Sequence, residues 1–125
     1  MILDTNAISA IADGDAGAVA RFAEAESVAM AVIAVGEYRF GIAQSRRRAE
    51  YERWLASAIV RCGVLDVTET TTAHYASIRA ELKLAGKPIP SNDLWIAALC
   101  REHRYPLLSR DEHFDWVRGL RRIGW

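Results

Sequence analysis

The chain opens with Met1-Ile2-Leu3-Asp4-Thr5-Asn6, a short apolar stretch that ends in an acid and two small polar residues. A strand this short is stable only beside neighbouring strands. Thr5 and Asn6 are residues that can cap a helix, so the stretch predicts a turn from a strand into a helix. Ligands of open parallel sheets bind at the carboxyl ends of the strands. Asp4 is therefore either a helix cap or a ligand, and its position alone favours the cap.

The length and composition of the chain predict one self-supporting domain, residues 1–125. Hydrophobic residues make up 51% of the 125 residues, but no apolar run approaches the roughly 18 residues that span a bilayer. The beginning of the chain lacks the basic start and long apolar stretch of a signal peptide. We therefore expect a cytoplasmic protein without membrane contact. Cys62 and Cys100 have no CxxC partner, so we expect free thiols in the core.

Apolar periodicity alternates between strand and helix along the whole chain. A parallel sheet of four to five strands with helices on both faces, a three-layer α/β domain, is the fold that this alternation predicts. The expected strands are residues 1–4, 27–32, 64–67 and 106–109, with residues 121–125 as a fifth at the edge. The expected helices are residues 6–12, 15–26, 34–44, 46–62, a segment from Thr68 or Thr70 to Ala85, and 91–103.

Four acids fall at equivalent places in this scheme. Asp4 ends the first strand, and Glu37 begins a helix soon after the second. Asp93 lies in the first turn of a helix that is apolar nearly all round, and Asp111 comes two residues after the fourth strand. In a right-handed parallel sheet these places share one edge. Because crowded carboxylates raise one another's pKa, a divalent cation between them is the natural solution.

The ligand types predict which metal such a site would hold. Carboxylates without His or Cys at a fixed spacing favour Mg²⁺ or Mn²⁺ over zinc or copper. A water on such an ion can attack phosphorus while the ion neutralises a phosphoryl oxygen, so phosphodiester hydrolysis is the expected reaction. The chain has 16 acids and 16 bases, which argues against a strongly electrostatic nucleic-acid binder. Without the four acids the rest carries a net charge of +4, and a nucleic-acid substrate becomes plausible.

Four segments in this order and spacing resemble the PIN domain, and among its members the VapC toxins most. They are Met1–Asn6, Val35–Gly41, Pro88–Ala98 and Leu107–Phe114. Each segment alone is a weak signal, but the four together span the chain from residue 1 to Gly119-Leu120. The resemblance implies a metal-dependent endoribonuclease, the toxin of a type II toxin–antitoxin pair. It also implies an RNA substrate, a VapB-like antitoxin in the acidic groove, and a homodimer.

The resemblance assigns roles to eight positions. The acidic quartet that holds Mg²⁺ or Mn²⁺ in the family matches Asp4, Glu37, Asp93 and Asp111. The polar neighbours that orient ligands or water match Thr5, Asn6, Asn92 and Ser109. Ser109 stands where Thr is frequent, which keeps the hydroxyl. No acid of the quartet is missing.

Other side chains near the last acid have weaker claims. Arg110 and His113 could contact a substrate phosphate, although a lone His in a short loop is more often a surface or packing residue. Glu112 or Asp115 could replace Asp111 as a ligand. Two tryptophans near the end of the sequence, Trp116 and Trp125, could stack on bases. A position in a subunit interface or in the core is favoured for both.

A non-catalytic PIN-like module that holds RNA or a protein in the same groove is the alternative function. The intact quartet argues against it.

Overall fold

Five short parallel strands form the centre of the computed structural model, which describes residues 1–125. Their order in the sheet is β3-β2-β1-β4-β5, and every neighbouring pair is parallel. The strands are β1 (Ile2–Leu3), β2 (Ala29–Ala31), β3 (Val64–Leu65), β4 (Leu107–Leu108) and β5 (Arg122–Ile123). The predicted edge strand is therefore present, and all five strands are shorter than the apolar runs that predicted them.

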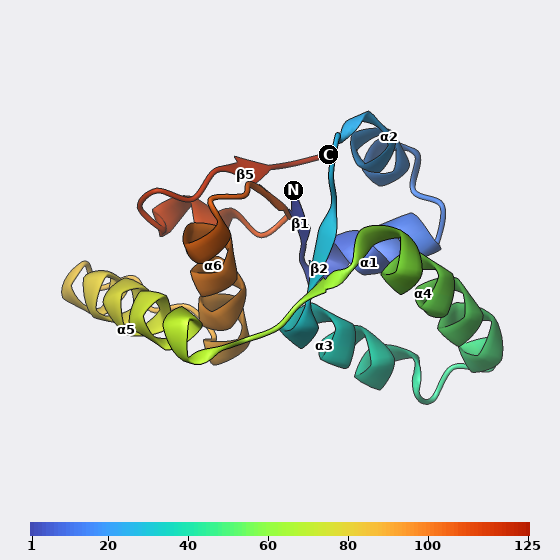
Figure 1. Ribbon diagram of the computed structural model, residues 1–125, viewed down its shortest axis with the longest axis horizontal. Coiled ribbons are helices and arrows are strands. Elements are labelled where there is room, and N and C mark those ends of the chain that lie inside the picture. The colour runs from blue at the N-terminus through green and yellow to red at the C-terminus, as the bar shows by residue number, and fades with distance from the viewer.

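Helices cover both faces of this sheet, which confirms the predicted three-layer α/β fold. They are α1 (Thr5–Ala12), α2 (Ala16–Glu24), α3 (Val32–Ile42), α4 (Arg48–Cys62), α5 (Glu69–Leu84), α6 (Ser91–His103) and the 3₁₀ helix η1 (Glu112–Trp116). In Figure 1, α5 and α6 lie on one side of the strands and α1, α2 and α4 on the other. No helix of the chain combines the length and the apolar composition that crossing a bilayer requires.

Strand β1 is the middle strand of the sheet. Ile2 and Leu3 are completely buried, as expected for a strand covered on both faces. Ile2 pairs with Ala29 on one side and with Leu107 on the other. The chain therefore leaves the centre of the sheet at Asp4, on the carboxyl edge.

Two local predictions were wrong at the strand-to-helix turns. Asp4 itself caps α1, because its Oδ1 accepts a hydrogen bond from the N–H of Ala7 at 2.7 Å. The proposed caps Thr5 and Asn6 are the first residues of the helix instead. Val32, expected in the second strand, begins α3 without a loop or a side-chain cap. The strand preference of a β-branched residue is overridden there because the sheet has reached its edge.

Helix α6 is packed between the sheet and α5. Its middle is buried on every side, from Ile96 to Cys100, which fits its nearly continuous apolar sequence. Trp95 stacks on Tyr75 of α5 with ring centroids 3.9 Å apart. Thr71 of α5, completely buried, donates a hydrogen bond to Glu102 at 2.7 Å. These contacts fix α6 and hence the acid in its first turn.

Both cysteines are free, as predicted. Cys100 is buried in α6, whereas Cys62 at the end of α4 is only partly buried.

Candidate functional site

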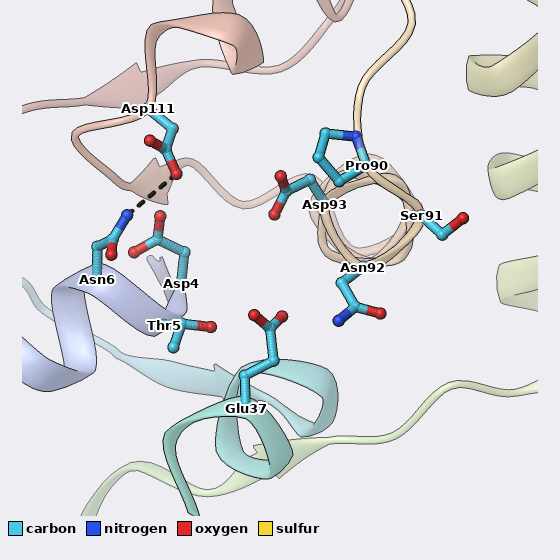
Figure 2. A pocket seen from close by; sticks show the side chains of 9 residues that line it. All are labelled: Asp4, Thr5, Asn6, Glu37, Pro90, Ser91, Asn92, Asp93 and Asp111. Carbon is cyan, nitrogen blue, oxygen red and sulfur yellow. Dashed lines mark hydrogen bonds between the residues drawn. The ribbon is translucent and has the colours of Figure 1, made fainter. Parts of the chain in front are cut away.

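A polar hollow of about 540 Å³ opens at the carboxyl edge of the sheet. None of the residues that line it is hydrophobic. Figure 2 shows all nine of them: Asp4, Thr5, Asn6, Glu37, Pro90, Ser91, Asn92, Asp93 and Asp111. Such a lining cannot bury apolar surface, so the hollow suits a charged or strongly polar ligand.

The four predicted acids come together in this hollow from four separate elements. Asp4 follows β1, Glu37 lies in the second turn of α3, Asp93 lies in the first turn of α6, and Asp111 directly precedes η1. In Figure 2 the carboxylates of Glu37 and Asp93 face those of Asp4 and Asp111 across the hollow. Their convergence follows from the topology, because all four positions lie at the carboxyl edge of a parallel sheet.

Asp4 is the most buried of the four acids, with 3% of its surface exposed. Burial raises the pKa of its carboxyl group to about 6, and the neighbouring charges of Asp111 and Asp93 act in the same direction. The hydroxyl of Ser109 and the N–H of Ala7 oppose this rise in pKa by stabilising the carboxylate. The same carboxyl group thus caps α1 and faces the hollow.

Glu37 and Asp93 are also harder to ionise than free carboxyl groups. Burial raises the pKa of Glu37, and the charge of Asp93 raises it further. The pKa of Asp93 is raised by burial and by Asp111, against the lowering effect of His113. Three of the four acids therefore have raised pKa values, which is the expected result of gathering like charges in a partly buried space.

Asp111 is held in position by two hydrogen bonds. The side-chain amide of Asn6 donates to its Oδ2 at 3.0 Å. Its backbone N–H donates to the hydroxyl of Ser109, also at 3.0 Å. Ser109 is completely buried and does not line the hollow, so it braces the loop that carries the acid.

His113 lies beside the hollow without lining it, and its ring packs against Phe114. Its Nε2 is 3.0 Å from Oδ2 of Asp93. The residue is the second of η1 and precedes Phe114, whose completely buried ring lies 4.8 Å from the imidazole. Because Phe114 anchors η1 in the core, His113 turns toward α6 instead of toward solvent.

The remaining candidates near Asp111 point away from the hollow. Arg110 forms an ion pair with Asp15 at 2.9 Å and lies over the ring of Trp125. Asp115 is paired with Arg122 at 2.7 Å. Neither these residues nor the exposed Glu112 lines the hollow. A phosphate contact by Arg110, or metal binding by Asp115, would first require its ion pair to break.

Sequence reasoning did not identify Pro90 and Ser91 as part of the wall. The usable signal was their position immediately before Asn92, at the amino end of α6. Asp93 lies in the first turn of α6, so the residues that start this helix border the same hollow as its carboxylate.

The donor atoms of the hollow fit a hard divalent cation. Every side-chain donor of the lining is an oxygen of a carboxylate, amide or hydroxyl group, or an amide nitrogen. Two buried oxygens, Oγ1 of Thr5 and Oε1 of Glu37, have no hydrogen-bond partner, which is costly unless a ligand satisfies them. No three of the acids yet lie close enough together to hold an ion as they stand.

Comparisons with known proteins agree with the fold. The profile of the PIN domain matches residues 1–120. Ribonuclease VapC2 of Haemophilus influenzae is 32% identical over 94 residues, which cover 74% of this chain and 71% of that protein. VapC ribonuclease Y4jK of Sinorhizobium fredii is 31% identical over 122 residues, 89% of this chain and 86% of that protein.

A solved structure, that of VapBC-1 from nontypeable Haemophilus influenzae, superposes with a TM-score of 0.86 at 26% identity and covers 99% of this chain and 96% of that one. The matched profile, the relatives and the shared fold lead to one conclusion: the chain belongs to the PIN domain family.

Proposed function

We propose that this protein is a metal-dependent endoribonuclease, the toxin component of a type II toxin–antitoxin pair. The observation that carries the proposal is the convergence of Asp4, Glu37, Asp93 and Asp111 on one hollow without a hydrophobic residue. In a PIN domain with relatives named VapC ribonucleases, that arrangement supports hydrolysis of RNA. The function and the site were both expected from the sequence.

The four carboxylates would hold Mg²⁺ or Mn²⁺. When bound, such an ion activates a water and neutralises charge on a phosphoryl oxygen. The raised pKa values of Asp4, Glu37 and Asp93 support this role, because a cation would relieve the repulsion that raises them. Asn6 donates a hydrogen bond to Asp111, so that carboxylate is already oriented, and Nε2 of His113 lies 3.0 Å from the carboxylate of Asp93.

Hydrolysis in this hollow needs no side chain as nucleophile. The oxygen of a water attacks phosphorus, the bond from phosphorus to the opposite ribose oxygen breaks, and that oxygen takes up a proton. Thr5 and Asn92 line the wall between Asp4, Glu37 and Asp93. Their hydroxyl and amide groups can donate to or accept from the water and the phosphate, which is the orienting role that proximity catalysis requires.

A VapB-like antitoxin and a second copy of the chain are the proposed protein partners. An acidic hollow attracts a cationic side chain, so an antitoxin segment with Arg or Lys would neutralise it and exclude RNA. Phe40, Val60 and Leu84 are 85%, 88% and 91% exposed. They lie on three different helices, so each is a single exposed apolar side chain that a partner could cover.

The experiment that tests the function compares RNA cleavage by the wild type and by Asp93→Asn, both purified without antitoxin and assayed with Mg²⁺ or Mn²⁺. We expect Asp93→Asn to abolish cleavage and to leave the fold intact, because the amide keeps the shape and removes a repelling charge. Asp66→Asn, which changes an exposed acid outside the hollow, should cleave as the wild type does. Equal cleavage by wild type and Asp93→Asn would refute the assignment.

The alternative, a non-catalytic module that binds RNA or a protein, makes a different prediction for metal binding. Calorimetric titration with Mn²⁺ should give binding in the wild type that Glu37→Gln weakens strongly. A module without a metal requirement would give no heat that depends on Glu37.

A further inference from the structure

Trp116 is an exposed aromatic side chain on a rigid support. It is 46% exposed at the end of η1, whereas Phe114 is completely buried and Val117 is only 2% exposed. The two neighbours anchor the segment in the core, so the backbone that carries the indole ring is fixed in place. The other tryptophans of the chain are at least partly buried. An aromatic ring held in solvent in this way is available for a ligand.

The indole ring lies one side chain away from the acidic hollow. Its centroid is 6.3 Å from that of His113. Nε2 of His113 in turn lies 3.0 Å from the carboxylate of Asp93, which Figure 2 shows on the wall of the hollow. A nucleotide with its phosphate at the acids could thus lay a neighbouring base against these two rings.

A cation completes this surface. Nζ of Lys87 lies 5.6 Å from the centroid of the Trp116 ring. Lys87 is exposed and has no carboxylate within 4.0 Å. Of the two acids of η1, Asp115 is neutralised by Arg122 and Glu112 points to solvent. A free ammonium group beside an aromatic face is the combination that holds single-stranded nucleic acid.

We propose that Trp116, His113 and Lys87 form a platform that binds single-stranded RNA next to the hollow. One base stacks on the indole ring and meets the imidazole ring, which is tilted by 48° to the indole, at its edge. Lys87 contacts a phosphate on the same strand. Stacking of this kind tolerates any base, so the platform strengthens binding without selecting a sequence. This inference rests on the proposed function, since it assigns the path of the RNA that the acids would cut.

The surroundings of Trp116 favour RNA over a protein as the occupant. A protein interface around a tryptophan is usually apolar at its centre. Next to Trp116 the chain carries charged residues, of which Asp115 is neutralised by Arg122, and the ammonium group of Lys87 from another segment lies 5.6 Å from the centroid of the ring. An unpaired cation beside an exposed ring suits a phosphate-bearing ligand.

The test measures binding of two labelled 12-nucleotide strands, oligo(A) RNA and an abasic ribose-phosphate analogue, by fluorescence anisotropy. Glu37→Gln serves as the background with Mg²⁺ present, so that cleavage does not interfere. Trp116→Ala should weaken oligo(A) binding by about 5-fold to 100-fold, the range for loss of one stacked base. It should leave abasic binding unchanged, and Trp116→Phe should restore most of the oligo(A) affinity.

Lys87→Ala should act differently, because a phosphate contact is independent of the base. It should weaken both strands equally and reduce the slope of log K against log salt by about 0.7. Matched controls lie at the other end of α6, where Tyr105 is 41% exposed and Arg104 is also on the surface. Tyr105→Ala and Arg104→Asn should bind both strands as the background protein does.

Three outcomes would overturn the platform. Unchanged oligo(A) affinity in both Trp116→Ala and Trp116→Phe is the first, and an equal loss for both strands in Trp116→Ala is the second. The third is normal RNA binding with an altered oligomeric state or antitoxin affinity, which would make Trp116 a protein contact. Because binding is measured without turnover, a wild type that fails to cleave RNA would refute the proposed function and not the platform.

Discussion

Asp4 combines two roles in one side chain that the sequence presented as alternatives. Its carboxylate caps α1 by accepting a hydrogen bond from the N–H of Ala7, and it also faces the three other acids of the hollow. Only 3% of the surface of Asp4 is exposed. A cap stabilises a helix by about 1 kcal/mol, whereas a buried charge destabilises the folded state. The residue therefore costs stability in order to keep a charge at the site.

Asp4→Asn should raise the stability of the metal-free protein at pH 7.5 by about 1 to 3 kcal/mol. Asn keeps the cap and removes the charge. The pKa of Asp4 is about 6 in the folded protein and near 4 in the unfolded chain, so the folded state binds more protons between these values. Stability of the wild type should consequently fall as pH rises from 4 to 6.

Urea denaturation in EDTA at several pH values checks this prediction. The difference between Asp4→Asn and the wild type should be small at pH 4 and largest above pH 6. Asp4→Ala is the control, since it loses both the charge and the cap and should gain less. A difference that does not vary with pH would contradict the burial of an ionising Asp4.

At the scale of elements, α6 is the support on which Asp93 depends. Thr71 of α5 donates to Glu102 near the end of α6 and also accepts the N–H of Thr68. Its complete burial means that neither bond can be replaced by water.

Thr71→Val should therefore reduce the free energy of unfolding by about 1 to 3 kcal/mol, because it leaves two polar groups without their partner. The neighbouring Thr72 is exposed, and Thr72→Val should change stability by less than about 0.5 kcal/mol. Thermal or urea melts of both variants measure the difference. Cleavage by the folded Thr71→Val protein at low temperature should equal that of the wild type.

Helices and strands could be predicted where the signal lies in neighbouring residues of the sequence. Gly63, with a φ of 79°, ends α4 where the sequence predicted a stop, and the apolar middle of α6 identified it as a central helix. The four acids followed from the alternation of strand and helix. The prediction that Val32 belongs to the second strand was wrong, because a strand ends at the edge of the sheet whatever the strand preference of its side chains.

The directions of the His113 and Arg110 side chains could not be predicted from the sequence, for a different reason. Whether a loop side chain turns inward depends on which neighbour is anchored, and here the burial of Phe114 directs His113 toward Asp93. Arg110 turns to Asp15, a residue 95 positions away in the chain. No local pattern encodes such a pairing.

The whole molecule holds four carboxylates together in a fold whose remaining residues have a net charge of +4. Without a cation, repulsion at the site should oppose folding, and a bound ion would remove it. We therefore expect the stability of the entire domain to depend on metal concentration.

Mn²⁺ or Mg²⁺ should raise the melting temperature of the wild type, by the equivalent of about 2.7 kcal/mol when the free ion reaches 100 times its Kd. Asp93→Asn should melt at or above the wild-type temperature in EDTA and should gain much less from the ion. Differential scanning fluorimetry across a metal titration gives both curves. Equal shifts in the two proteins would contradict metal binding by Asp93.

The bond from Asn6 to Asp111 joins residues 105 positions apart, and β1 pairs with β4 from the other end of the chain. Contacts between segments so far apart in the sequence form late in folding, because a long loop must close before they can be made. The local helices can therefore form before the hollow does. We expect the four acids to be brought together only in the last step of folding, when the central strands pair.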